Sequence, residues 1–197
     1  MQWVIVGLGN PGEEYDGMRH NAGRMAVEFF AKKIGAGDFR ENTKANALVS
    51  SCEIGKNTAT LVLPDTFMNK SGSAVMKFVK SAKAAERLIV CYDDLDLPLG
   101  AMKISFDRGS GGHKGLESVM RAIKTKKFVR IRIGVSPATT KGVVKKPTGE
   151  KAVLDFILKK FKPSEQSILH DTFKRAALAL ETILTDGRER AMNQFNS

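Results

Sequence analysis

The sequence predicts a single α/β domain that spans residues 1–197. Its central mixed and largely parallel sheet is expected to be flanked by helices on both faces. Strand-like and helix-like segments interleave along the chain without an internal repeat or a linker, as in folds that pack helices against a sheet. The 197 residues are about the length of one domain, and 42% of them are apolar, which is enough to bury a core without disulfides or metals.

Short apolar or alternating runs predict six strands. The first run, Trp3-Val-Ile-Val6, is continuous and stops at Gly7, as expected of a buried strand. The last run alternates charged and apolar residues from Arg130 to Ile133, which is typical of a strand with one solvent-exposed face. The six predicted strands lie at 2–6, 47–53, 58–63, 88–92, 103–106 and 129–135.

Helical periodicity predicts five helices. Apolar residues from Ala22 to Phe30 recur at the spacing of one helix face, and Gly35 follows them, so we expect the helix to end there. Ser164 is expected to cap a long helix whose apolar positions extend to Leu184. The other three helices are predicted at 71–82, 116–123 and 154–161, and residues 136–149 are predicted to form a mobile surface loop.

The composition excludes several classes of protein. No apolar run is long enough to cross a bilayer, and the start of the chain lacks the basic and apolar regions of a signal peptide. The two isolated cysteines, Cys52 and Cys91, suit a reducing compartment. We therefore expect a cytoplasmic protein that is not associated with a membrane.

Basic residues are concentrated in one segment. The formal net charge is +11, and residues 118–149 contain no Asp or Glu. Segregation of one sign of charge favours binding of nucleic acid or phosphate, although the same residues can simply keep a surface solvated. The basic residues of this segment are Arg121, Lys124, Lys126, Lys127, Arg130, Arg132, Lys141, Lys145 and Lys146.

A glycine motif follows the first predicted strand. Gly7-Leu-Gly-Asn-Pro-Gly12 has the G-x-G-x-x-G spacing of dinucleotide-binding sites. That site requires a helix N-terminus at the pyrophosphate, whereas Pro11 interrupts this segment and Glu13 and Glu14 would place negative charge there. The sequence therefore does not predict a nucleotide cofactor.

Two of the three histidines lie in loops next to apolar segments. His20 and His113 occur among Gly and Asn residues, where α/β folds carry their chemistry, and an imidazole is the usual general base near neutral pH. His170 lies in the predicted C-terminal helix and is interpreted as structural. The same interpretation remains open for the two loop histidines.

Asp93, Asp94 and Asp96 follow a buried strand, at the end of a sheet where ligands bind. A carboxylate there can orient a histidine, ligate a metal or form a turn. The chain shows no His/Cys/Asp cluster at ligand spacing, so we expect no metal. Asn10 and Asn69 also follow strands. Asn69 can cap a helix, and each amide can instead bind a peptide backbone.

Four short motifs follow one another along the chain. They are Val6-Gly-Leu-Gly-Asn-Pro-Gly12 with Tyr15 and Arg19-His-Asn-Ala-Gly23, then Thr66-Phe-Met-Asn-Lys-Ser-Gly72, then Asp93-Asp-Leu-Asp-Leu-Pro98, then Gly111-Gly-His-Lys-Gly-Leu116. Together they resemble bacterial-type peptidyl-tRNA hydrolases over essentially the whole chain. The resemblance implies a monomeric esterase without metal or cofactor that releases the peptide from peptidyl-tRNA lost by the ribosome, and so recycles the tRNA.

The resemblance also implies roles for individual residues. His20 would activate water, and Asp93 would orient its imidazole. Asn10 and Asn69 would bind the peptide and the terminal adenosine, with Met68 beside them. The other implied contacts are Tyr15, Phe67, His113 and Lys114 for substrate, and Lys103, Arg108 and Arg132 for tRNA phosphates, with Arg132 the candidate for the 5′-phosphate of the acceptor stem.

Three positions differ from the family pattern. Met18 replaces a threonine, Ser105 replaces a lysine, and Lys114 replaces the asparagine that is taken to position water or substrate. The lysine can stabilise an oxyanion or contact phosphate, and the sequence does not decide between these roles. Two rival functions are an RNA-binding protein that keeps the hydrolase fold, such as a splicing partner, and a nucleotide-dependent oxidoreductase built on the first glycine motif.

Overall fold

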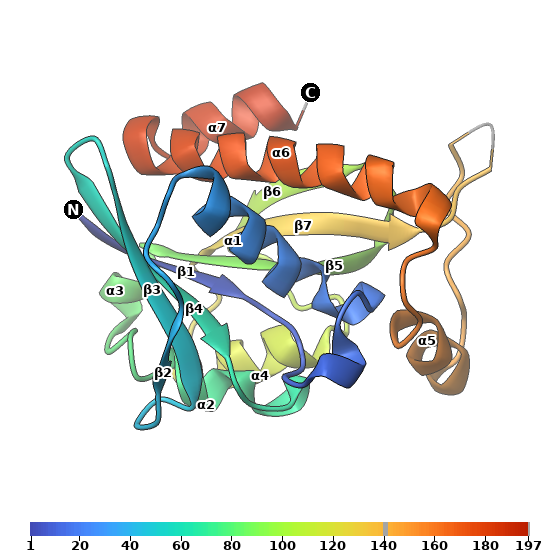
Figure 1. The fold of residues 1–197 in the computed structure, drawn as a ribbon, viewed down its shortest axis with the longest axis horizontal. Helices are drawn as coiled ribbons and strands as arrows, with labels where there is room; N and C mark the ends of the chain where they lie inside the picture. Colours follow the sequence, from blue (N-terminus) through green and yellow to red (C-terminus); the bar gives the residue numbers. More distant parts are fainter. Residues whose placement is uncertain (140–141, 197) are drawn as a thin grey trace.

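The sheet contains seven strands in the order β2-β3-β4-β1-β5-β7-β6 (Figure 1). The computed structural model describes residues 1–139 and 142–196. The four central strands run parallel to one another, in the order β4-β1-β5-β7. The pairs at the two edges, β2-β3, β3-β4 and β7-β6, are antiparallel. The prediction of a mixed and largely parallel sheet is confirmed. The strands are β1 (Gln2–Gly7), β2 (Arg40–Asn42), β3 (Ala47–Ile54), β4 (Asn57–Pro64), β5 (Leu88–Pro98), β6 (Met102–Phe106) and β7 (Val129–Ser136).

Helices cover both faces of the sheet (Figure 1). Successive strand residues alternate between two cores, so that Ile5 and Ile89 face one helical layer while Val6 and Val90 face the other. The first layer contains α1 (Ala22–Lys33), α6 (Pro163–Asp186) and α7 (Arg188–Phe195), and the second contains α2 (Ser71–Val75), α3 (Ala82–Ala85) and α4 (Lys114–Ile123). α5 (Glu150–Ile157) lies beyond the end of the sheet.

Several predicted element boundaries are wrong. The helix predicted at 71–82 is divided into α2 and α3, because Ser81 adopts an extended conformation and caps α3 by accepting the Ala84 N–H at 3.1 Å. The long C-terminal helix begins at Pro163 with Lys162 as its N-cap, not at Ser164, in keeping with the preference of proline for the first helical turn. β2 and α7 were not predicted, and α5 begins four residues before the predicted 154–161 segment.

The prediction of a solvent-exposed face for β7 is wrong at Arg130, which is fully buried. Its guanidinium carbon lies 4.3 Å from the centroid of the Phe128 ring, and Nη2 donates to the Arg108 carbonyl oxygen at 2.5 Å. The ring provides cation–π attraction, whereas the buried Nε and Nη1 make no hydrogen bond within the described residues. Lys141 of the basic segment lies outside the described residues, and residues 142–149 belong to no helix or strand.

Close packing of α1 on the sheet positions the segment that precedes it. A Cβ atom on Gly23 would lie 2.1 Å from the carbonyl oxygen of Cys91, so only glycine allows this approach. The short 3₁₀ helix η2 (Arg19–Asn21) leads directly into α1. This packing places η2 against β5. Asp93, Asp94 and Asp96 lie within β5, because the strand continues to Pro98 and does not end at residue 92 as predicted. In the described residues no helix is long and apolar enough to cross a membrane.

Candidate active site

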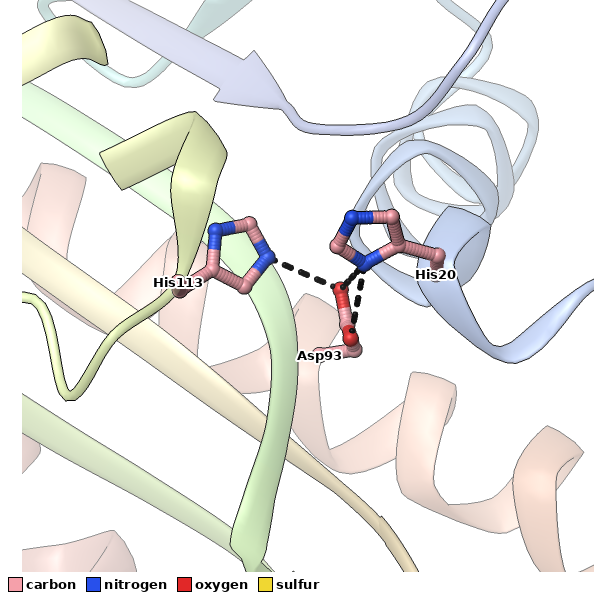
Figure 2. Close-up of side chains that lie close together, drawn as sticks. All are labelled: His20, Asp93 and His113. Atoms are coloured by element: carbon pink, nitrogen blue, oxygen red, sulfur yellow. Dashed lines mark hydrogen bonds and ion pairs between the residues drawn. The ribbon is translucent and has the colours of Figure 1, made fainter. Parts of the chain in front are cut away.

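Three side chains that are distant in the sequence meet (Figure 2). Asp93 lies in β5, His20 in η2, and His113 at the start of α4. His20 Nδ1 lies 3.0 Å from both carboxylate oxygens of Asp93. His113 Nε2 lies 3.0 Å from Asp93 Oδ1. The side chains of His20 and Asp93 are 9% and 2% exposed, so the predicted proximity of these two residues is confirmed.

The hydrogen-bond partners define the ring nitrogen that carries each proton. His113 is the N-cap of α4, and its Nδ1 accepts the N–H groups of Gly115 and Leu116 at 3.1 and 3.2 Å. Because Nδ1 is an acceptor, the neutral ring carries its proton on Nε2 and donates to Asp93. Asp93 as a carboxylate also requires a donor at His20 Nδ1. The lone pair of His20 is then on Nε2, where it can take a proton.

The electrostatics of the site support an ionised Asp93. Burial favours the neutral acid, but the charges of His20 and His113 and their hydrogen bonds outweigh it and hold the pKa of Asp93 well below its usual range. For His20, burial lowers the pKa, and the Asp93 charge and hydrogen bond raise it by more, so the pKa lies above the ordinary 6.5. Asp93 therefore stabilises the protonated imidazole that a general base must form.

The cluster opens into a cleft of about 900 Å³. His20, Asp93 and His113 lie on one side of it, and α5 forms another wall. The cleft is large enough for part of a substrate rather than for a water molecule alone. Its other lining residues include the charged Asp94, Asp96, Arg108, Lys114, Arg132 and Lys146, and Glu150, Val153, Leu154 and Ile157 of α5.

Two acidic residues of β5 already pair with cations of the cleft. Arg132 Nε donates to Asp94 Oδ2 at 2.7 Å, and Lys146 Nζ donates to Asp96 Oδ1 at 2.5 Å. Lys114 extends into solvent, with its side chain 66% exposed and its Nζ 3.8 Å from Glu117. The cleft therefore contains two cations that are paired with carboxylates and one exposed lysine.

Asn10 is held rigidly near this site. Its Oδ1 accepts the Met68 N–H at 2.8 Å. The side chain of Asn21 accepts the Asn10 N–H at 3.0 Å and donates to the Asn10 carbonyl at 2.9 Å. Sequence reasoning assigned no role to Asn21, although it directly follows His20 in the family motif. Within the described residues, the side-chain nitrogen Nδ2 of Asn10 makes no hydrogen bond to the protein.

Several residues that the resemblance assigns to substrate binding lie outside the cleft lining. Met68 is buried against the start of α4, where a Cβ on Gly115 would lie 2.4 Å from its sulfur. Phe67 is 57% exposed and Asn69 is also exposed, both in the segment before α2. Tyr15 is half-buried in the 3₁₀ helix η1 (Glu13–Tyr15). Neither these residues nor Asn10 and Lys103 belong to the cleft lining, whereas His20, Asp93, Arg108, His113, Lys114 and Arg132 do.

His20, Asp93 and His113 also lie close enough together to ligate one metal ion. Within the described residues, one ligand atom from each of His20, Asp93 and His113 lies within 4.8 Å of the others. A metal needs an unprotonated ring nitrogen, and here the nitrogens that face Asp93 are hydrogen-bond donors. The arrangement therefore fits a hydrogen-bonded triad better than a metal site.

Comparisons with known proteins agree with this geometry. The family model for peptidyl-tRNA hydrolase matches residues 4–197. The peptidyl-tRNA hydrolase of Carboxydothermus hydrogenoformans is 40% identical over 98% of both chains, and that of Aquifex aeolicus is 37% identical over 98% of this chain and 95% of its own. The crystal structure of the Acinetobacter baumannii enzyme superposes with a TM-score of 0.86 at 33% identity, covering 99% of this chain and 94% of that one. The chain therefore belongs to the peptidyl-tRNA hydrolase family and is an enzyme that hydrolyses peptidyl-tRNA.

Proposed function

We propose that this enzyme cleaves the ester between the peptide and the terminal ribose of tRNA with His20 as general base. One observation carries the proposal. His20 donates from Nδ1 to a buried Asp93, which directs the basic Nε2 away from the carboxylate. The cleft beside it admits substrate.

The reaction follows from this geometry. His20 Nε2 takes a proton from water as the water oxygen bonds to the ester carbonyl carbon. Asp93 stabilises the imidazolium that forms. The intermediate then breaks its bond to the ribose oxygen, which leaves with the proton from His20. Both products are formed without a cofactor or a metal.

Substrate contacts extend from the cleft. We assign Asn10, Asn69, Met68, Phe67 and Tyr15 to the peptide and the terminal adenosine. Phe67 and Asn69 are exposed, and exposed aromatic and amide groups suit the stacking and hydrogen bonding of single-stranded RNA. His113 positions Asp93 as its second hydrogen-bond donor.

The cations of the cleft are assigned to the tRNA backbone. Arg132, Arg108 and Lys114 line it, and Lys103 lies opposite Arg132 across the β6–β7 pair. Arg132 is the candidate for the 5′-phosphate, since its Nε is held by Asp94 while the planar guanidinium offers further donors. Lys114 is exposed, which favours a phosphate contact over oxyanion stabilisation.

The cellular role follows from the substrate. Peptidyl-tRNA that leaves the ribosome early keeps tRNA out of translation, and its hydrolysis returns that tRNA. We propose that the enzyme acts in the cytoplasm as a monomer, since substrate arises there and each chain carries the whole triad.

A pair of substrates separates this function from the rivals. The enzyme is expected to cleave N-acetyl-aminoacyl-tRNA and to leave aminoacyl-tRNA with a free amino group intact. Release of labelled amino acid is measured with both substrates at equal concentration. Binding without cleavage of either would support an RNA-binding role, and equal cleavage of both would indicate a general esterase.

A further inference from the structure

An ion pair between a buried Arg19 and a partly exposed Glu165 joins the segment that carries His20 to the first turn of α6. Arg19, which is 5% exposed, precedes His20 in η2. Its Nη2 donates to Glu165 Oε1 and Oε2 at 2.9 and 2.7 Å. Its Nη1 donates to the carbonyl oxygens of Lys159 and Lys160 at 3.2 and 2.7 Å. One side chain therefore binds three residues that lie about 140 positions away in the sequence.

The backbone reinforces this junction. The Arg19 N–H donates to the Lys159 carbonyl at 3.1 Å, and the Phe161 N–H donates to the Gly17 carbonyl at 2.9 Å. The guanidinium carbon lies 4.8 and 5.0 Å from the ring centroids of Phe156 and Phe161, close enough for cation–π attraction to both rings. Residues 17–19 and 159–161 thus form one packed unit.

Glu165 has a second partner. Its Oε2 also accepts the Lys162 N–H at 2.7 Å, which satisfies a backbone donor at the start of α6. One carboxylate therefore fixes the first turn of α6 and holds Arg19. Because Arg19 is buried, loss of the carboxylate would leave its charge without a compensating partner.

This junction determines where α5 lies relative to His20. α5 contacts η2 directly, and its residues Val153, Leu154 and Ile157 line the same cleft as His20. The end of α5 leads into the residues that Arg19 binds. A shift of the junction would therefore move one wall of the cleft without touching the bonds between His20 and Asp93.

We propose that Arg19 and Glu165 are positioning residues of the hydrolase, which hold α5 at the distance from His20 at which the cleft accepts peptidyl-tRNA. The inference rests on the proposed function, because it takes the cleft beside His20 as the substrate site. Neither side chain touches the reacting atoms. Their effect passes through residues 159–161 to α5, while His20 stays held by its own bonds to Asp93.

Glu165→Gln and Arg19→Lys test this proposal in the full chain. Glutamine keeps the size and an acceptor for the Lys162 N–H but removes the charge, and lysine keeps the charge but loses the planar set of donors. We expect KM for N-acetyl-aminoacyl-tRNA to rise about tenfold in either variant, since the wall that aligns substrate is displaced. We expect kcat to stay within about threefold of the parent, because the triad is unchanged.

The matched control is Glu181→Gln on the same helix. Glu181 pairs with Lys33 of α1, and neither residue lines the cleft. This variant is expected to keep the parental KM and kcat. The double variant of Arg19 and Glu165 is expected to resemble the single ones, because residues that act as a unit are not additive. Amide exchange at Arg19 and Phe161 should accelerate in both single variants and not in the control.

Assays are run below the melting temperature of each variant, so that a purely structural role would lower that temperature and leave KM unchanged. That result would overturn the proposal. If Glu165→Gln does not fold, Arg19→Lys provides the same comparison. Failure of the proposed function gives a different result, because His20→Ala would then keep its turnover. That result does not depend on KM in the Arg19 and Glu165 variants.

Discussion

His20→Ala is expected to abolish nearly all turnover and to leave the affinity for peptidyl-tRNA largely unchanged. General-base catalysis contributes about 10²–10⁴-fold to a rate, and His20 supplies the one basic nitrogen that Asp93 directs into the cleft. The cations proposed to bind the tRNA, such as Arg108 and Arg132 of the cleft, are not affected. Single-turnover cleavage with excess enzyme, together with filter binding, measures the two quantities separately.

His170→Ala is the matched control for this variant. His170 lies on α6 with its side chain 56% exposed, and its ring meets Phe29 edge-on at 5.3 Å. Removing this imidazole should leave cleavage unchanged. Undiminished single-turnover cleavage by His20→Ala would show that the base is another group.

Asp93→Asn is expected to slow cleavage by about 10²–10⁴-fold while the fold is retained. Asparagine has nearly the same shape, but it brings no charge to stabilise the protonated His20. Its NH₂ group can also donate to His20 Nδ1, which would move the ring proton to Nε2 and block the base. The single-turnover rate constant at pH 8 measures the loss.

The pH profile of Asp93→Asn distinguishes this explanation from simple misfolding. The base must be neutral, so kcat/KM falls as pH drops through the His20 pKa, which lies above 6.5 in the parent. Removing the Asp93 charge leaves burial to lower that pKa, and the acid limb should move to lower pH. An unshifted acid limb would contradict the pairing, and Asp171→Asn, an exposed change on α6, should reproduce the parental profile.

Local apolar runs predicted six of the seven strands, whereas the pairing of His20 with Asp93 was implied by the resemblance to the family and not by a local signal. From local pattern alone Asp93 could be the partner of a histidine, a metal ligand or a turn residue, and it was placed after a strand that in the structure continues to Pro98. The second hydrogen-bond donor to Asp93, His113, was harder to predict from the sequence. His113 was predicted to line the site, but its bond to Asp93 depends on its role as the cap of α4.

Other features depend on contacts that no local pattern records. Arg130 alternates with apolar residues as an exposed side chain would, yet it is buried, and it donates to the carbonyl of Arg108, which follows the neighbouring strand β6. Arg19 likewise finds Glu165 146 positions away. Asn21 bonds to both backbone groups of Asn10. In each case the partner is brought near by tertiary packing, so the burial of the side chain could not be predicted from its neighbours in the sequence.

The tautomer of His20 tests the central claim most directly. Nitrogen-15 NMR of the protein labelled at histidine reports the proton on each ring nitrogen, and His113→Ala and His170→Ala variants assign the signals to three rings. Above its pKa, His20 should carry its proton on Nδ1 with Nε2 unprotonated, and it should titrate above 6.5. A proton on Nε2 in the neutral ring, or titration below 6.5, would contradict a base oriented by Asp93.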